Sequence, residues 1–163
     1  MTELRDASAG VPDVDTLGVL PRFDRHLGIA TRVESPGVCV AVLELAPEHR
    51  NIEGRIHGGV ALTLLDTAMG HAVGSLGPAV VEGAATLQLS CQFLAAPAGL
   101  RMEARGMVTR LGGRSAFVDG TVRDERGTEI ARAQGVWRVW RPATSPDRSV
   151  KSSRERDDEP GPG

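Results

Sequence analysis

The chain has 163 residues, a formal net charge of −2 and 40% hydrophobic residues. This length and apolar content fit one domain with its own core and leave no room for a second full domain. The slightly acidic balance lacks the broad basic surface that non-specific binding to nucleic acid requires, so we expect no nucleic-acid partner.

The two ends of the chain differ in composition from its middle. Residues 1–15 and 143–163 are rich in charged and small polar residues and poor in aliphatic ones, so we expect both to be disordered and the folded domain to span residues 16–142. The start of the chain does not have the pattern of a signal peptide. The most apolar stretch, residues 58–81, is interrupted by an Asp, a His and several glycines. We therefore expect a cytoplasmic protein with no membrane span.

The first half of the folded part predicts one strand and one long helix. Apolar and polar residues alternate over residues 33–46 around Pro36-Gly37, and residues 38–45 are expected to form a strand, followed by a loop over residues 47–56. From residue 58 to about residue 76, apolar side chains recur every three or four positions on most sides of a helix. Because such a helix is not stable in water, other structure must wrap around it.

The second half predicts strands, because the apolar period changes to two after Gly77-Pro78. The strands are expected at residues 86–94, 100–111, 115–122 and 129–140, with turns at 111–114 and 124–127. In the first of them, one face is expected to hold Leu87, Leu89, Cys91 and Phe93. The order is one strand, one helix and four strands in an antiparallel meander. A curved antiparallel sheet around one central helix is an α+β arrangement, the hotdog fold.

Asp66 is the only carboxylate in the predicted helix. An ionised group placed against an apolar core is costly unless it is compensated. One interpretation is a helix position that faces solvent or bonds a neighbouring strand. The functional interpretation is a general base or a nucleophile.

The tripeptide His57-Gly58-Gly59 lies where the loop becomes the helix. The first amides of a helix have no partner within it and lie at the positive end of its dipole. Glycine at positions 58 and 59 lets a carbonyl oxygen approach these amides closely. The segment therefore predicts an oxyanion site, with a tight turn and a capping His as the alternative.

The spacing of these groups implies a second subunit. Asp66 lies eight residues beyond Gly58, so its Cα is ~12 Å further along the helix axis. One carboxylate side chain cannot bridge that gap. If both groups act on one carbonyl, Asp66 must come from another copy of the chain, most simply in a two-fold dimer.

Residues 51–72 (NIEGRIHGGVALTLLDTAMGHA) resemble the signature of the hotdog thioesterases of the phenylacetic-acid-degradation type, which are related to the 4-hydroxybenzoyl-CoA thioesterases. In that family an Asn or Gln precedes a His-Gly-Gly, and an acid follows nine residues after the His. Those places are held here by Asn51, His57 and Asp66. The resemblance extends over roughly residues 23–140. It implies an enzyme that hydrolyses an acyl-CoA thioester to the free acid and coenzyme A, without a cofactor, as a homo-oligomer: a dimer, or a dimer of dimers.

The resemblance also implies a role for each residue. Gly58 would polarise the thioester carbonyl through its backbone amide, Asn51 would orient the substrate or water, and His57 would hold the loop and the substrate. Asp66 of a second subunit would activate water or attack the carbonyl directly. Thr86 lies where some members carry a hydroxyl that helps to position water, although Thr is also an ordinary strand residue.

Further candidates have less support in the sequence. Gly59 would contribute to substrate binding beside Gly58. Arg110 and Arg114 flank the Gly112-Gly113 turn and could hold coenzyme A phosphates, with solvated arginines as the alternative. No cluster has metal-ligand spacing, so we expect no metal. Three residues with reactive side chains are expected to be structural: His49, Cys91 and His71, the last because it lies well around the helix from Asp66.

The same fold hosts other functions, which we keep as alternatives. Hotdog dehydratases carry a His-Phe-Pro segment, whereas here His49 is followed by Arg50-Asn51, and the Gly-Asp-x-Asn-Pro-x-His stretch of the hydratases is absent. A non-catalytic acyl-thioester-binding protein is the alternative from another class. The near absence of aromatic residues indicates an aliphatic pocket lining, but the acyl group stays open.

Overall fold

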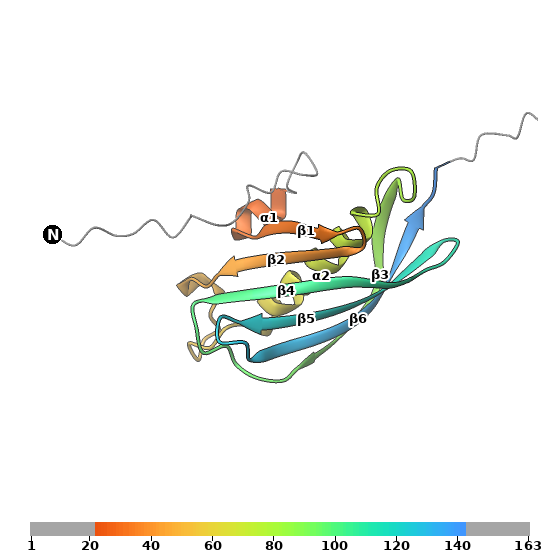
Figure 1. Ribbon diagram of the computed structural model, residues 1–163. Helices are drawn as coiled ribbons and strands as arrows, with labels where there is room; N and C mark the ends of the chain where they lie inside the picture. Colours follow the sequence, from red (N-terminus) through yellow and green to blue (C-terminus); the bar gives the residue numbers. More distant parts are fainter. Residues whose placement is uncertain (1–21, 143–163) are drawn as a thin grey trace, which may run out of the picture.

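The computed structural model describes residues 22–142 (Figure 1). The elements in chain order are α1 (Arg22–Leu27), β1 (Ala30–Ser35), β2 (Val38–Glu44), the 3-10 helix η1 (Pro47–His49), α2 (Gly58–Gly74), β3 (Gly83–Phe93), β4 (Arg101–Leu111), β5 (Ser115–Asp124) and β6 (Glu129–Trp140). The expectations for residues 1–15 and 143–163 fall outside the described part. Within it, no helix is both long and apolar enough to cross a membrane.

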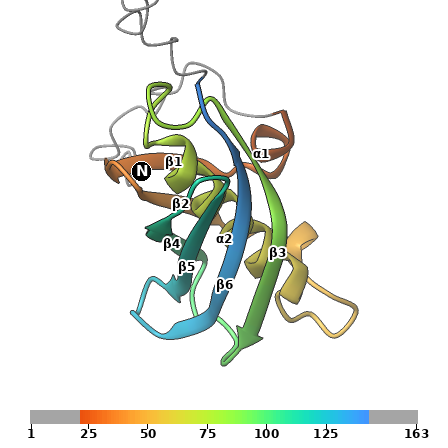
Figure 2. The same ribbon diagram turned by 90° about the vertical axis from the view of Figure 1, so that its right-hand side faces the viewer.

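The six described strands form one antiparallel sheet in the order β1-β2-β4-β5-β6-β3. The sheet curves around α2, as the two views show (Figures 1 and 2). Eight residues of α2 are buried against it: Ala61, Leu64, Leu65, Thr67, Ala68, Met69, Ala72 and Val73. This confirms the predicted hotdog fold and the prediction that other structure wraps the long helix.

A pair of glycines sets how closely α2 approaches the sheet. Gly106 on β4 and Gly120 on β5 are register partners. A Cβ at Gly106 would lie 2.6 Å from the Ala68 carbonyl oxygen, and a Cβ at Gly120 would lie 2.6 Å from Met69 Sδ. A side chain at Gly106 would therefore push the backbone of the helix away, and one at Gly120 would displace the Met69 and Leu65 side chains. The glycine pair lets α2 pack closely on β4 and β5.

The predicted four-stranded meander is wrong in one connection. Strands β4, β5 and β6 do follow one another, but β3 pairs with β6 and lies at the edge of the sheet. Residues 94–100, which join β3 to β4, contain Pro97 and Gly99 and are too long for a tight hairpin turn. The carboxylate of Asp124 fastens this connection by accepting the Ala98 amide at 3.1 Å. This amide is the main reason that the pKa of Asp124 lies below its usual value.

Two elements at the start of the described part were not predicted. Helix α1 has six residues, which is too few for an apolar period to be read, and strand β1 was seen only as alternation before Pro36-Gly37. Strands β1 and β2 form a hairpin whose turn contains Gly37 at a positive φ of 84°. The predicted turns at residues 111–114 and 124–127 are confirmed, the second with Gly127 at a φ of 83°.

Strand β3 contains a bulge that changes which side chains share a face. Its register against β6 shifts between Thr86 and Gln88. As a result Thr86 pairs with Trp137 and Leu89 with Gly135, two residues apart on β6, so Thr86 and Leu89 face the same side. The predicted alternation holds for Leu89, Cys91 and Phe93 but is interrupted at Leu87. The bulge therefore places Thr86 on the helix side of the sheet.

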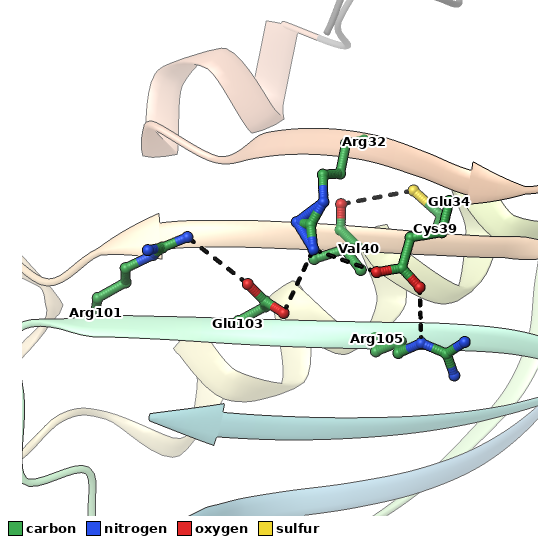
Figure 3. Close-up of polar contacts among 7 residues, drawn as sticks. All are labelled: Arg32, Glu34, Cys39, Val40, Arg101, Glu103 and Arg105. Carbon is green, nitrogen blue, oxygen red and sulfur yellow. Dashed lines mark hydrogen bonds and ion pairs between the residues drawn. The ribbon is translucent and has the colours of Figure 1, made fainter. Parts of the chain in front are cut away.

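The face of β1, β2 and β4 away from α2 carries a network of ion pairs (Figure 3). Arg32 lies 3.2 Å from Glu34 and 3.7 Å from Glu103, and Arg105 lies 2.9 Å from Glu34. Half-exposed pairs of this kind contribute at most about 1 kcal/mol each. Their side chains cover Val40, which is fully buried. The network is therefore mainly a polar cover over an apolar strand.

The two cysteines are free thiols. Cys39 is fully buried, and burial raises the pKa of its thiol to about 11. Cys91 is partly buried, and burial raises the pKa of its thiol as well. Neither thiol is therefore activated as a nucleophile, which is consistent with the structural role expected for Cys91.

Candidate active site

The first turn of α2 leaves one backbone donor unused. His57 is the N-cap, and its Nδ1 accepts the Gly59 amide at 2.9 Å, while its carbonyl accepts the Val60 amide at 2.9 Å. The Gly58 amide has no hydrogen-bond partner among residues 22–142. It lies at the positive end of a 17-residue helix. Gly58 can therefore donate to a carbonyl oxygen, whereas the Gly59 amide already serves the cap.

The loop before α2 is held by side chains that bond its backbone. Asn51 Oδ1 accepts the amides of Glu53 and Arg55, each at 3.0 Å. His49 is buried, and its Nδ1 accepts the Ala46 amide at 2.9 Å. His49 is thus structural, as expected. The carbonyl oxygen of Asn51 shapes the loop, which leaves its side-chain amino group as the part that can contact a ligand.

Asp66 lies on the side of α2 that the sheet leaves exposed. Its Oδ1 accepts a hydrogen bond from Thr86 Oγ1 on β3 at 2.9 Å. The bulge in β3 makes this contact, because regular alternation would turn Thr86 to the other face. The hydroxyl fixes the orientation of the carboxylate and leaves Oδ2 free to act on a substrate or water.

A pocket of about 490 Å³ opens beside this pair. It lies between α1, α2, β3 and β6, and Figure 2 shows α1 next to the start of β3. Its lining residues are Phe23, Asp24, Leu62, Thr63, Asp66, Thr67, Gly70, His71, Ala84, Ala85, Thr86, Leu89 and Trp137. Asn51, His57 and Gly58 do not line it. One chain therefore brings Asp66 and Thr86 together in the pocket and keeps the predicted oxyanion site apart from them.

Two lining residues were not predicted for the site. His71 was expected to be structural, and Asp24 was not considered. In the structure His71 Nε2 lies 3.6 Å from Asp24 Oδ2, and Thr67 Oγ1 donates to Asp24 Oδ1 at 3.0 Å. Burial lowers the pKa of His71, with the charge of Asp24 opposing this effect. The sequence signal was the four-residue spacing of Thr63, Thr67 and His71, which places polar side chains on one side of α2.

The remaining predicted residues lie away from the pocket. Arg110 is near the end of β4, and Arg114 is in the turn before β5. Both side chains are exposed, and neither lines the pocket. Within residues 22–142, no group of three His, Cys, Asp or Glu side chains is arranged to hold a metal ion.

Comparisons with known proteins agree with this fold. The profile of the family described as the thioesterase superfamily matches residues 53–131. A provisionally named esterase of Halobacterium salinarum is 33% identical over 147 residues, which cover 83% of this chain and 94% of that protein. The chain belongs to the thioesterase superfamily. These similarities support the prediction that the chain is a hydrolase.

Solved structures show the same architecture. A Bacillus halodurans protein crystallised with coenzyme A has a TM-score of 0.67 and 26% identity, covering 75% of this chain and 80% of its own. The Escherichia coli PaaI protein from the phenylacetic acid degradation operon has a TM-score of 0.66 and 20% identity, covering 72% and 83%. The second likeness concerns the fold alone.

Proposed function

We propose that the chain is an acyl-CoA thioesterase that hydrolyses an acyl-CoA thioester to the free acid and coenzyme A. One observation carries the proposal. A helix of a thioesterase-superfamily fold has at its start an amide, that of Gly58, without a partner in the described part of the chain, and further on an exposed, hydrogen-bonded carboxylate, Asp66. These are the two groups that acyl transfer requires, an oxyanion donor and a base or nucleophile.

The proposed reaction uses both groups on one carbonyl. The Gly58 amide donates a hydrogen bond to the thioester oxygen and so stabilises the negative charge that develops on it. In one route Asp66 takes a proton from the water that attacks the carbonyl carbon, and the tetrahedral intermediate expels the coenzyme A thiolate, which receives that proton and leaves the free acid. In the other route Asp66 attacks the carbon itself and expels the thiolate, and water then hydrolyses the acyl–Asp66 anhydride to the free acid. Thr86 keeps the carboxylate oriented through its hydroxyl. Asn51 and His57 hold the loop that positions Gly58.

A second copy of the chain would complete the site. Gly58 and Asp66 are eight residues apart on one continuous helix, ~12 Å along its axis, and the pocket around Asp66 does not reach Gly58. Large apolar side chains are exposed on the edge strand β3, with Leu87 63% and Phe93 57% exposed, and on α2, where Leu62 lines the pocket. An unpaired edge strand with an apolar face calls for a partner. We propose a two-fold dimer, and a dimer of dimers as in the family.

The proposed substrate also bears on the expected coenzyme A contacts, the cellular location and the need for a cofactor. Arg110 and Arg114 are exposed guanidinium groups that would contact the phosphates of coenzyme A. We also propose that the enzyme is cytoplasmic and hydrolyses the coenzyme A ester without an added cofactor.

A thiol-release assay tests the function. Acyl-CoA and acyl-carrier-protein thioesters of different acyl groups are incubated with the protein in the presence of EDTA, and free thiol is measured. At least one ester is expected to be cleaved well above background. If esters bind but none is cleaved, the protein is a non-catalytic acyl-thioester binder. If the thioester is kept while the acyl chain gains or loses water, it is a hotdog dehydratase or hydratase.

Replacing Thr86 by valine is expected to lower kcat about tenfold, because the Asp66 carboxylate loses its hydroxyl donor. Serine at this position keeps the hydroxyl and is the matched control, with kcat expected close to that of the wild type. Steady-state thiol release with the best ester measures both. A valine variant as fast as the serine variant would show that the bond between Thr86 and Asp66 has no part in the reaction.

A further inference from the structure

The pocket beside Asp66 continues toward a polar end that the proposed reaction does not use. The pocket is lined there by Thr67, the residue after Asp66, and by His71, five residues past Asp66, and α1 adds Asp24. The rise from Asp66 to His71 is ~7.5 Å along the helix axis. Thr67 and His71 leave α2 about 100° and 140° around its axis from Asp66, so with Asp24 they line a different side of the pocket from the Asp66 carboxylate. This polar end is placed to contact a part of a bound molecule other than the carbonyl at Asp66.

Asp24 is the unusual member of this cluster. It is 4% exposed, yet it lines the pocket. One oxygen accepts the Thr67 hydroxyl at 3.0 Å, and the other lies 3.6 Å from His71 Nε2, longer than a hydrogen bond. A carboxylate can accept about four hydrogen bonds. Asp24 therefore offers a desolvated negative charge with acceptor capacity left over.

The path from Asp66 to Asp24 is open because of Gly70. This residue is four positions after Asp66, so a side chain there would lie on the same side of α2 and fill the pocket. A Cβ at Gly70 would lie 3.5 Å from Trp137 Nε1, which lines the pocket from β6. The walls on the His71 side of Asp66 include the apolar residues Phe23, Ala84 and Ala85, while Leu62 and Leu89 line the pocket on the side toward Gly58. An acyl chain fits this lining, with its far end at the polar cluster.

We infer that Asp24, Thr67 and His71 form the distal end of the acyl pocket and select acyl groups whose far end carries a hydrogen-bond donor, such as a hydroxyl. The inference rests on the proposed function. A methyl end would leave the second oxygen of the buried carboxylate, Oδ2, without a hydrogen-bond donor, and a site built to bond a hydroxyl rejects analogues that lack it. A carboxylate end would meet a like charge at short range. Asp24 and His71 are thus specificity-determining residues rather than catalytic ones.

The test uses straight-chain acyl-CoA esters of graded length, each made with a methyl, a hydroxyl or a carboxylate at the far end. At the best length, kcat/KM of the wild type is expected to be at least about tenfold higher for the hydroxyl form than for the methyl form, and lowest for the carboxylate form. Equal values for the three forms at every length would overturn the inference without any variant.

The variant Asp24→Asn keeps the shape of the side chain and the acceptor for Thr67 but removes the charge. It is expected to raise the ratio of carboxylate to hydroxyl kcat/KM about tenfold. The matched control is Asp119→Asn, which removes a carboxylate from the face of the sheet away from α2, where it accepts from Gln134. The control is expected to leave the ratio unchanged. A ratio that moves equally in both variants, or in neither, contradicts the role of Asp24.

Binding of non-cleavable thioether analogues, measured by titration calorimetry, separates this inference from the proposed function. If no ester is cleaved but the hydroxyl analogue binds most tightly and loses that advantage in Asp24→Asn, the pocket assignment stands and the hydrolase fails. If esters are cleaved without any preference for the far end, the hydrolase stands and the assignment fails. If no analogue binds, both fail.

Discussion

Replacing Asp66 by asparagine is expected to slow thioester hydrolysis by about 10²-fold or more. Base or nucleophilic catalysis needs an ionised carboxylate, which the amide cannot supply. The fold should be unaffected, because Asp66 is exposed and the asparagine oxygen can still accept the Thr86 hydroxyl. Thiol release and the oligomeric state by gel filtration are measured on the same preparations.

The Asp119→Asn variant again serves as the control for loss of one carboxylate, since Asp119 lies on the outer face of the sheet. Its rate should equal that of the wild type. Near-normal turnover by Asp66→Asn would mean that Asp66 has only a structural role. The mechanism proposed above would then be wrong even if the protein is a thioesterase.

Mixing two inactive variants is expected to restore about a quarter of the wild-type activity. One variant is Asp66→Asn. The other is Gly58→Pro, which removes the unpartnered amide while keeping the helix, because proline is well accepted at the first helical position. The extended backbone of His57, with φ −65° and ψ 132°, also suits a residue before proline. Loss of an oxyanion donor of this kind lowers the rate by about 10² to 10³.

The recovery follows from how a shared site is assembled. With random exchange about half of the dimers are mixed, and each mixed dimer has one site with an intact Gly58 from one chain and an intact Asp66 from the other. If a single chain supplied both residues, every site would keep one defect and the mixture would stay inactive.

The matched control for the proline variant is Gly58→Ala. It adds the same Cβ, 3.3 Å from the Phe93 ring, but keeps the amide, so it is expected to retain most of the activity. Subunit exchange is verified by mass spectrometry of differently tagged chains. An inactive mixture with exchange verified would refute the shared site.

The predicted elements that proved correct are those with a long local pattern. Helix α2 has four turns of apolar residues, and β4, β5 and β6 are joined by glycine-containing turns, so their order and bounds could be predicted closely. Helix α1 is too short for such a pattern. The pairing of β3 with β6 is a contact between distant parts of the chain, which no local pattern encodes.

The site shows the same division. The cap at His57, the glycine amides and Asp66 were found because they follow one another along a single helix start. The contact of Thr86 with Asp66 depends on a bulge, and strict alternation would have turned this hydroxyl away. His71 was predicted to be structural because it lies well around the helix axis from Asp66. The pocket reaches it because α1 brings Asp24 to the other side of the same groove.

The residues that hold α2 against the sheet, the glycine pair on β4 and β5, are different from the residues of α1 that line the pocket. The close packing of α2, the helix that carries Asp66, on the sheet depends on Gly106 and Gly120, neither of which lines the pocket. The pocket wall contributed by α1 is a separate short element that can change in sequence without moving the carboxylate. A mutant library for new acyl preferences would therefore vary Phe23 and Asp24 and leave the two glycines unchanged. Substrate preference could then be altered while the Asp66 carboxylate keeps its position.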